Sequence, residues 1–210
     1  MGTSTLIDIV SSMLISGFLL LTALQMDEKA VKNTFYSETN LTVQQNLTSL
    51  VENLEYDFRK IGYCANPNLQ PKTYMYLVSG DTSSISFVAD LDNTGVLDTV
   101  KYFLGGSVPG CPNPDVRMLY RQVNSGPAVG SNLGVTEFYL KYLDSFGQQL
   151  PVPFTAPSQV QMVEITVRVE PTASYGNAST SNTFASWNDA PQNFALWRQT
   201  RLISRNLRNR

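Results

Sequence analysis

Histidine is absent from the 210 residues of this chain, and charged side chains make up only 15% of it. Without histidine the chain lacks the commonest general base and the commonest zinc ligand of proteins. It also contains no G-x-S-x-G motif, no P-loop and no cysteine beside a candidate base. The formal net charge of −2 does not indicate the basic surface that binds nucleic acid. We therefore expect no enzyme, and no nucleic-acid partner is evident.

Proline is missing before Pro67, and neither lysine nor arginine occurs in residues 1–28. The apolar run over residues 6–26 is close to the roughly 20 residues that cross a bilayer as a helix. Asp8 is the only charged residue in this run, and a carboxylate in apolar surroundings needs a partner. We predict that residues 1–28 form a transmembrane or filament-core helix segment.

A second helical stretch follows, in which apolar residues recur at steps of three and four. These residues are Val43, Leu47, Leu50, Val51, Leu54, Phe58 and Ile61. Such spacing places them on one stripe of a helix, and Glu52, Asp57 and Arg59 are expected on a solvated face. Gly62 is the expected stop. We predict one helix over residues 4–61, about 85 Å long and weakest at 33–42. Its apolar half would project, and residues 29–62 would pack on the globular domain.

After Pro67 the hydrophobic period changes from 3.6 to 2, which is typical of strands. Strands are predicted at 73–79, 84–89, 100–104, 117–123, 134–143 and 160–169. The polar, turn-rich residues 171–197 are expected to form a long surface loop. We therefore predict an α+β fold, in which the helix packs on an antiparallel β-rich globular domain over residues 63–210.

Cys64 and Cys111 are the only cysteines, and both lie in loop-like sequence rich in proline, glycine and asparagine. In an oxidising compartment they would most simply form a disulfide. Closing a loop of that length stabilises by roughly 4 kcal/mol on the chain-entropy model. The alternative is a pair of unrelated thiols.

Oxygen-bearing side chains alternate along residues 90–98, at Asp90, Asp92, Thr94 and Asp98. Hard calcium ions favour such ligands, so calcium is the one cofactor that the sequence suggests. Lys101 stands where an EF-hand needs glutamate, which excludes that motif. The alternative is a turn between strands in which aspartate and asparagine bond their own backbone.

Five arginines lie in the last 13 residues: Arg198, Arg201, Arg205, Arg208 and Arg210. They would contact an acidic surface, such as a neighbouring subunit, or form a solvated final strand and tail. Asn177 begins an Asn-Ala-Ser sequon in the expected loop and is the best glycosylation candidate. The alternative is a sequon that occurs by chance.

The order Ser4-Thr5-Leu6-Ile7-Asp8 before a long apolar helix resembles the start of type IV pilin-like proteins. That family has phenylalanine, threonine, leucine, isoleucine and glutamate there, and Asp8 stands in place of the glutamate. Three short segments are similar to the branch of J-type minor pseudopilins and W-type pilins. They are LEYDFR at 54–59, DLDNTG at 90–95 and RNL at 205–207.

The resemblance implies a structural subunit of a type IV pilus-like or pseudopilus filament. Identical subunits would join through Leu6, Ile7 and Asp8 of the helix, with the β-domain on the outer surface. In that family the acidic residue meets the N-terminal amine of an adjacent subunit. The subunit would sit in the inner membrane before pilus or secretion machinery assembles it into an extracellular filament. Two alternatives stay open: a minor pseudopilin that initiates or caps a type II secretion filament, and a single-pass membrane-anchored periplasmic binding domain.

Overall fold

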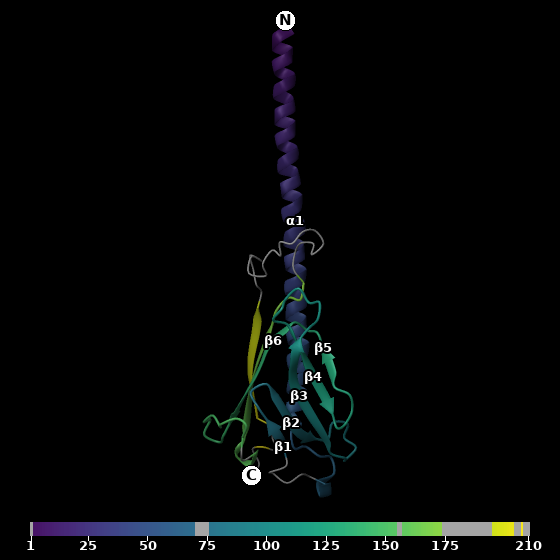
Figure 1. Ribbon diagram of the computed structural model, residues 1–210, viewed down its shortest axis with the longest axis vertical. Helices are drawn as coiled ribbons and strands as arrows, with labels where there is room; N and C mark the ends of the chain where they lie inside the picture. Colours follow the sequence, from purple (N-terminus) through teal and green to yellow (C-terminus); the bar gives the residue numbers. More distant parts are fainter. Residues whose placement is uncertain (1, 70–75, 155–156, 174–194, 204–206, 208–210) are drawn as a thin grey trace. The chain divides into compact units, whose positions relative to one another are not determined.

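The computed structural model describes residues 2–69, 76–154, 157–173, 195–203 and 207, without the side chains of residues 2–4 and 67 (Figure 1). A long N-terminal helix precedes two antiparallel sheets, which confirms the expected α+β layout. The chain divides into two compact units, Met1–Leu41 and Thr42–Arg210, and each is described by itself.

Helix α1 runs without interruption from Gly2 to Arg59. This confirms the predicted helix, and residues 33–42, expected to be its weakest part, are helical throughout. The predicted stop is confirmed as well, because Gly62 has a φ of +71°, a conformation that glycine adopts readily. A Cβ at this position would also lie 2.7 Å from the ring of Tyr76, so packing excludes a side chain there.

The larger sheet consists of five strands that lie side by side in chain order, all antiparallel (Figure 1). They are β1 (Leu77–Gly80), β2 (Ser84–Ala89), β3 (Asp98–Ser107), β4 (Arg117–Val123) and β5 (Val129–Ser131). The predictions for β2 and β4 match the observed bounds, and β3 extends beyond the predicted strand at both ends. The sequence pattern missed β5.

The smaller sheet has the order β6-β7-β8 and is also antiparallel. Its strands are β6 (Val135–Leu143), β7 (Met162–Val169) and β8 (Leu196–Leu202). The prediction that residues 171–197 form only a loop is wrong at its end, because Leu196 and Trp197 already pair with Val169 and Arg168 of β7.

The part of α1 from residue 42 onward packs into the core of the Thr42–Arg210 unit. Val43, Leu50, Leu54 and Phe58 of the predicted apolar stripe are buried. The ring centroids of Phe58 and Phe87 lie 5.3 Å apart. Burying a side chain of this size contributes about 1.5–3 kcal/mol, so this helix face holds the sheets in place.

Asp57 corrects the predicted solvated face, since it is only 4% exposed. Its Oδ2 accepts hydrogen bonds from the Tyr102 hydroxyl and the Arg121 Nε, each at 2.6 Å. Burial, together with the Asp57 carboxylate, raises the pKa of Tyr102 well above its usual value. The hydrogen bond to Asp57 raises the pKa of Arg121. Asp57 of α1 can therefore be buried against β3 and β4, because Tyr102 and Arg121 satisfy its carboxylate.

Candidate functional site

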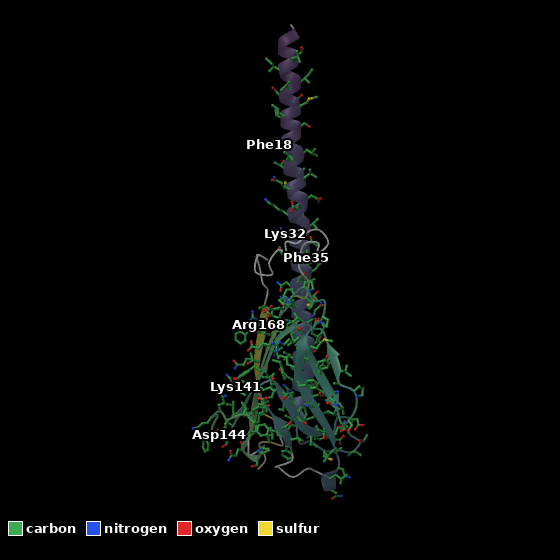
Figure 2. The ribbon with its side chains drawn as sticks, in the orientation of Figure 1. Phe18, Lys32, Phe35, Lys141, Asp144 and Arg168 are labelled. Carbon is green, nitrogen blue, oxygen red and sulfur yellow. The ribbon has the colours of Figure 1, made fainter. Side chains whose placement is uncertain are left out.

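The apolar segment of α1 within the Met1–Leu41 unit presents its hydrocarbon to the surroundings on every side. Leu6, Ile7, Met13 and Leu24 are all exposed, and Phe18, which points away from the helix axis in Figure 2, is 71% exposed. A helix that is apolar all round belongs in a bilayer or in a core. By length and composition, α1 is able to cross a membrane.

Two hydroxyl groups of this segment are bonded within the helix. Ser12 Oγ donates to the carbonyl of Ile9 at 2.9 Å, and Thr22 Oγ1 donates to the carbonyl of Leu19 at 2.8 Å. Such back-bonds satisfy hydroxyl donors without water. The segment therefore presents fewer unsatisfied polar groups to an apolar environment than its serine and threonine content suggests.

Asp8 lies on the same side of the helix as several hydroxyl residues, and Ile15 and Leu19 lie among them on that side. At 3.6 residues per turn, Thr5, Asp8, Ser11, Ser12 and Ser16 fall within an arc of about 140°. Asp8 lies near the middle of this arc and is exposed. Leu6 and Ile7 lie outside this arc, so the three predicted assembly residues do not share one side of the helix.

Asp90 is fully buried in the connection between β2 and β3. Its carboxylate accepts three backbone N–H groups, from Ala65 at 2.9 Å, Thr94 at 3.1 Å and Gly95 at 2.9 Å. These bonds fold the 90–95 loop onto the chain that follows α1. They use Asp90 oxygens that a calcium ion would need.

The other residues of the predicted calcium loop also bond within the protein. Asp92 accepts the Thr94 hydroxyl at 2.8 Å, and this bond lowers the pKa of the Asp92 carboxyl group. Asp98 accepts the side-chain amide of Asn124 at 2.7 Å. In the described part of the chain, no group of three or more Cys, Asp or Glu side chains is placed to hold a metal. These hydrogen bonds have the form expected for a turn between strands, and calcium binding stays a prediction.

The predicted disulfide is not formed in this structure, where Cys64 and Cys111 are free thiols. The Sγ atom of Cys64 is buried 3.6 Å from the carbonyl oxygen of Gly95. The Sγ atom of Cys111 lies 3.6 Å from the carbonyl oxygen of Thr172. The two thiols therefore contact different loops. The prediction of a disulfide rested on the loop-like sequence around each cysteine, which does not show where each loop lies in the fold.

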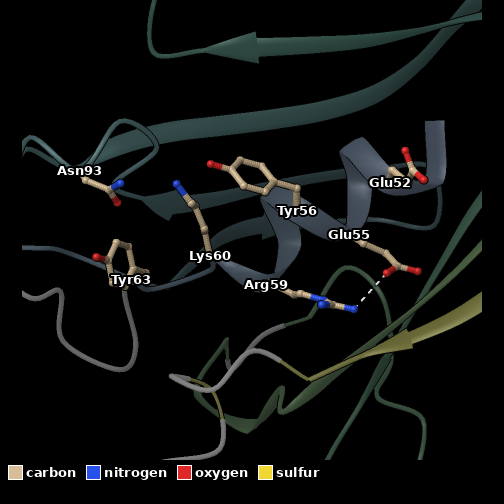
Figure 3. Close-up of a pocket in the computed structure, with 7 residues that line it drawn as sticks. All are labelled: Glu52, Glu55, Tyr56, Arg59, Lys60, Tyr63 and Asn93. Carbon is tan, nitrogen blue, oxygen red and sulfur yellow. Dashed lines mark hydrogen bonds and ion pairs between the residues drawn. The ribbon is translucent and has the colours of Figure 1, made fainter. Parts of the chain in front are cut away.

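A groove of about 620 Å³ lies beside the end of α1, and sequence reasoning missed it (Figure 3). Its lining combines aromatic, charged and amide side chains: Glu52, Glu55, Tyr56, Arg59, Lys60, Tyr63 and Asn93. The Lys60 Nζ donates to the Leu91 carbonyl at 2.6 Å and lies 4.7 Å from the Tyr56 ring centroid. The groove is therefore built from the end of α1 together with the 90–95 loop.

The described arginines near the C-terminus are engaged within the chain. Arg201 Nε lies 2.6 Å from the buried Glu164 carboxylate, whose pKa is lowered by this bond. Arg198 lies 3.7 Å from Glu55 of α1. Both arginines lie in strand β8, and the acidic partners named here belong to the same chain. Arg205, Arg208, Arg210 and the sequon residue Asn177 lie outside the described residues.

Comparisons with known proteins find no match for the chain among protein-family models, curated proteins or solved structures.

Proposed function

We propose that this chain is a structural subunit of a type IV pilus-like or pseudopilus filament. The subunits would join through the apolar segment of α1, and the β-rich unit would form the outer surface. Before assembly, the same segment would hold each subunit in the inner membrane. Pilus or secretion machinery would then move it into an extracellular filament.

The observation that carries the proposal is the exposed apolar surface of α1 between residues 6 and 26. Residues such as Phe18 and Met26 stay exposed within the chain. An apolar surface of this extent calls for cover from outside the chain. A filament core made of identical helices supplies that cover, and so does a bilayer before assembly.

Asp8 would give the assembly its register. A carboxylate among packed apolar helices is costly unless a cation meets it, and removing one partner of a buried pair costs about 3–5 kcal/mol. The resemblance to pilins suggests the N-terminal amine of an adjacent subunit as that cation. Each incoming subunit would then have one favoured axial position, at which its amine and the neighbouring Asp8 meet.

Electron microscopy of filaments sheared from cells tests this proposal. We expect abundant filaments from the native chain, loss of filaments with Asp8→Ala, and retention with Asp8→Glu, which keeps the carboxylate. Asp27→Ala is the matched control, because it removes a carboxylate from the same helix just beyond the apolar run. Normal filaments with Asp8→Ala would contradict the role given to Asp8.

Two other outcomes would replace the proposal. Trace amounts of the chain at filament tips would favour a minor pseudopilin that initiates or caps a secretion filament. A monomer in detergent, with no filaments on the cell, would favour a single-pass membrane-anchored binding domain. The ability of α1 to cross a membrane is what keeps this last candidate open.

A further inference from the structure

We propose that the groove beside the end of α1 binds a short, neutral oligosaccharide. This inference stands apart from filament assembly, because every residue that lines the groove lies in the Thr42–Arg210 unit. Four kinds of observation support it: exposed aromatic rings, unpaired polar groups, balanced charge and a rigid frame.

Two tyrosine rings provide the apolar part of the groove. Tyr56 is 59% exposed and Tyr63 is 37% exposed, and both line the groove (Figure 3). Tyrosine joins a flat apolar face to a polar hydroxyl. The C–H face of a pyranose ring is flat and apolar, while its edge carries hydroxyls, so a sugar ring matches such a surface on both counts.

Unpaired polar side chains lie beside these rings. Within the described residues, neither the Glu52 carboxylate nor the Asn93 amide makes a hydrogen bond, and the same is true of the Tyr56 and Tyr63 hydroxyls. Together they offer acceptors from the carboxylate and both donors and acceptors from the amide and hydroxyls. Sugar hydroxyls donate and accept at once, so a mixed set of this kind suits them.

The charges of the groove point to a neutral ligand. Glu52 and Glu55 balance Arg59 and Lys60 in number, and Arg59 pairs with Glu55 at 3.0 Å. An anionic ligand would meet the unpaired carboxylate of Glu52. A cationic ligand would meet the Lys60 ammonium group at the face of the Tyr56 ring. A neutral polar ligand avoids both repulsions.

The frame of the groove is held before any ligand arrives. The buried Asp90 carboxylate holds the 90–95 loop, in which Asn93 adopts a φ of +61°. The Asp90 N–H donates to the Tyr63 carbonyl at 2.8 Å, and Lys60 binds the Leu91 carbonyl. A preformed site loses less conformational freedom on binding. The volume of about 620 Å³ also falls within the usual range for ligand sites.

The test uses the full chain in a polyoxyethylene detergent, because maltoside and glucoside detergents carry sugar headgroups that would compete. Maltotriose, cellotriose, chitotriose and mannotriose are titrated separately by calorimetry and by saturation-transfer NMR. We expect saturable binding of at least one of them, and Tyr56→Ala or Tyr63→Ala should weaken it at least about tenfold. Asn93→Gly, which keeps the positive φ, should weaken it several-fold.

Phe146→Ala is the matched control, since Phe146 is an exposed aromatic residue that does not line the groove. It should leave binding unchanged, and circular dichroism should show every variant folded. The inference is overturned if no trisaccharide binds at millimolar concentration, or if binding survives both tyrosine substitutions. It is equally overturned if polyglutamate or trilysine binds with the tyrosine dependence expected for the sugar.

Discussion

Phe18 and Phe58 are the same kind of residue in the same helix, yet they lie in opposite surroundings. Phe18, in the Met1–Leu41 unit, is 71% exposed, whereas Phe58, in the Thr42–Arg210 unit, is fully buried against Phe87 and Tyr102. Apolar burial drives folding when the cover comes from the same chain, and association when it comes from elsewhere. One helix therefore contributes to the folded core at its end and leaves an apolar surface uncovered by the described residues at its beginning.

The comparison predicts its largest effect at Phe58. Phe58→Ala should lower the free energy of unfolding by about 3–5 kcal/mol, because it leaves a cavity between α1 and the larger sheet. Urea unfolding followed by circular dichroism measures the change, with the exposed Phe146→Ala as a control. A loss no larger than that of the control would mean that α1 does not hold the core together.

The second effect is expected at Asp57. Asp57→Ala removes the acceptor shared by the Tyr102 hydroxyl and Arg121, and should cost about 1–3 kcal/mol of unfolding free energy. Arg121 is partly exposed and can turn to water, which keeps the cost below that of a fully buried pair. Asp57→Asn, which keeps an oxygen acceptor, should recover part of the loss in the same urea experiment. Equal losses in the two variants would refute the role given to this oxygen.

A smaller, pH-dependent effect on the free energy of unfolding is expected at Glu164. Its bond to Arg201 lowers the pKa of Glu164 in the folded chain below the ordinary value of 4.5. The stabilisation is therefore complete above pH 4.5 and is lost as the pH falls through the folded pKa. Urea unfolding in a series of acidic buffers should show that the native chain has a higher free energy of unfolding than Glu164→Gln. This difference should shrink as the pH falls below 4.5. A difference independent of pH would contradict the assignment.

The smallest effect should come from Phe18. Phe18→Ala should change the unfolding free energy of the Thr42–Arg210 unit by less than about 0.5 kcal/mol, because the side chain lies outside the core. The same variant should reduce recovery of sheared filaments if the proposed assembly is correct. A stability loss comparable to that of Phe58→Ala would erase the contrast between the two ends of α1.

Periodicity was enough to predict much of the fold. The apolar stripe from Val43 to Phe58 identified the buried helix face, and alternation placed β2 and β4 at their observed bounds. The strand β5 has only three residues, too few for alternation to register. In β8, Trp197 and the polar residues after it hide the pattern of an edge strand.

The candidate sites depend on contacts that no local pattern records. Asp57 looks like one more charged helix residue, because its partners Tyr102 and Arg121 lie 45 and 64 residues away along the chain. Similarly, Tyr56 and Asn93 share a groove only because the buried Asp90 folds its loop back toward the end of α1. The alternating oxygen-bearing side chains at 90–98 did identify this loop. The hydrogen bonds within it, however, have the form expected for a turn between strands.

Polar contacts near the end of α1 also fix its angular phase in the Thr42–Arg210 unit. Asn46 donates to the Leu133 carbonyl, Asp57 accepts from Tyr102 and Arg121, and Lys60 donates to Leu91. Apolar packing alone would tolerate small rotations or slides of a helix, because methyl groups have no directional partners. A rotation by one residue, about 100°, would separate all of these polar pairs together. These polar contacts therefore permit only one rotational position of the helix end. Setting register in this way is the best attested role of buried polar groups.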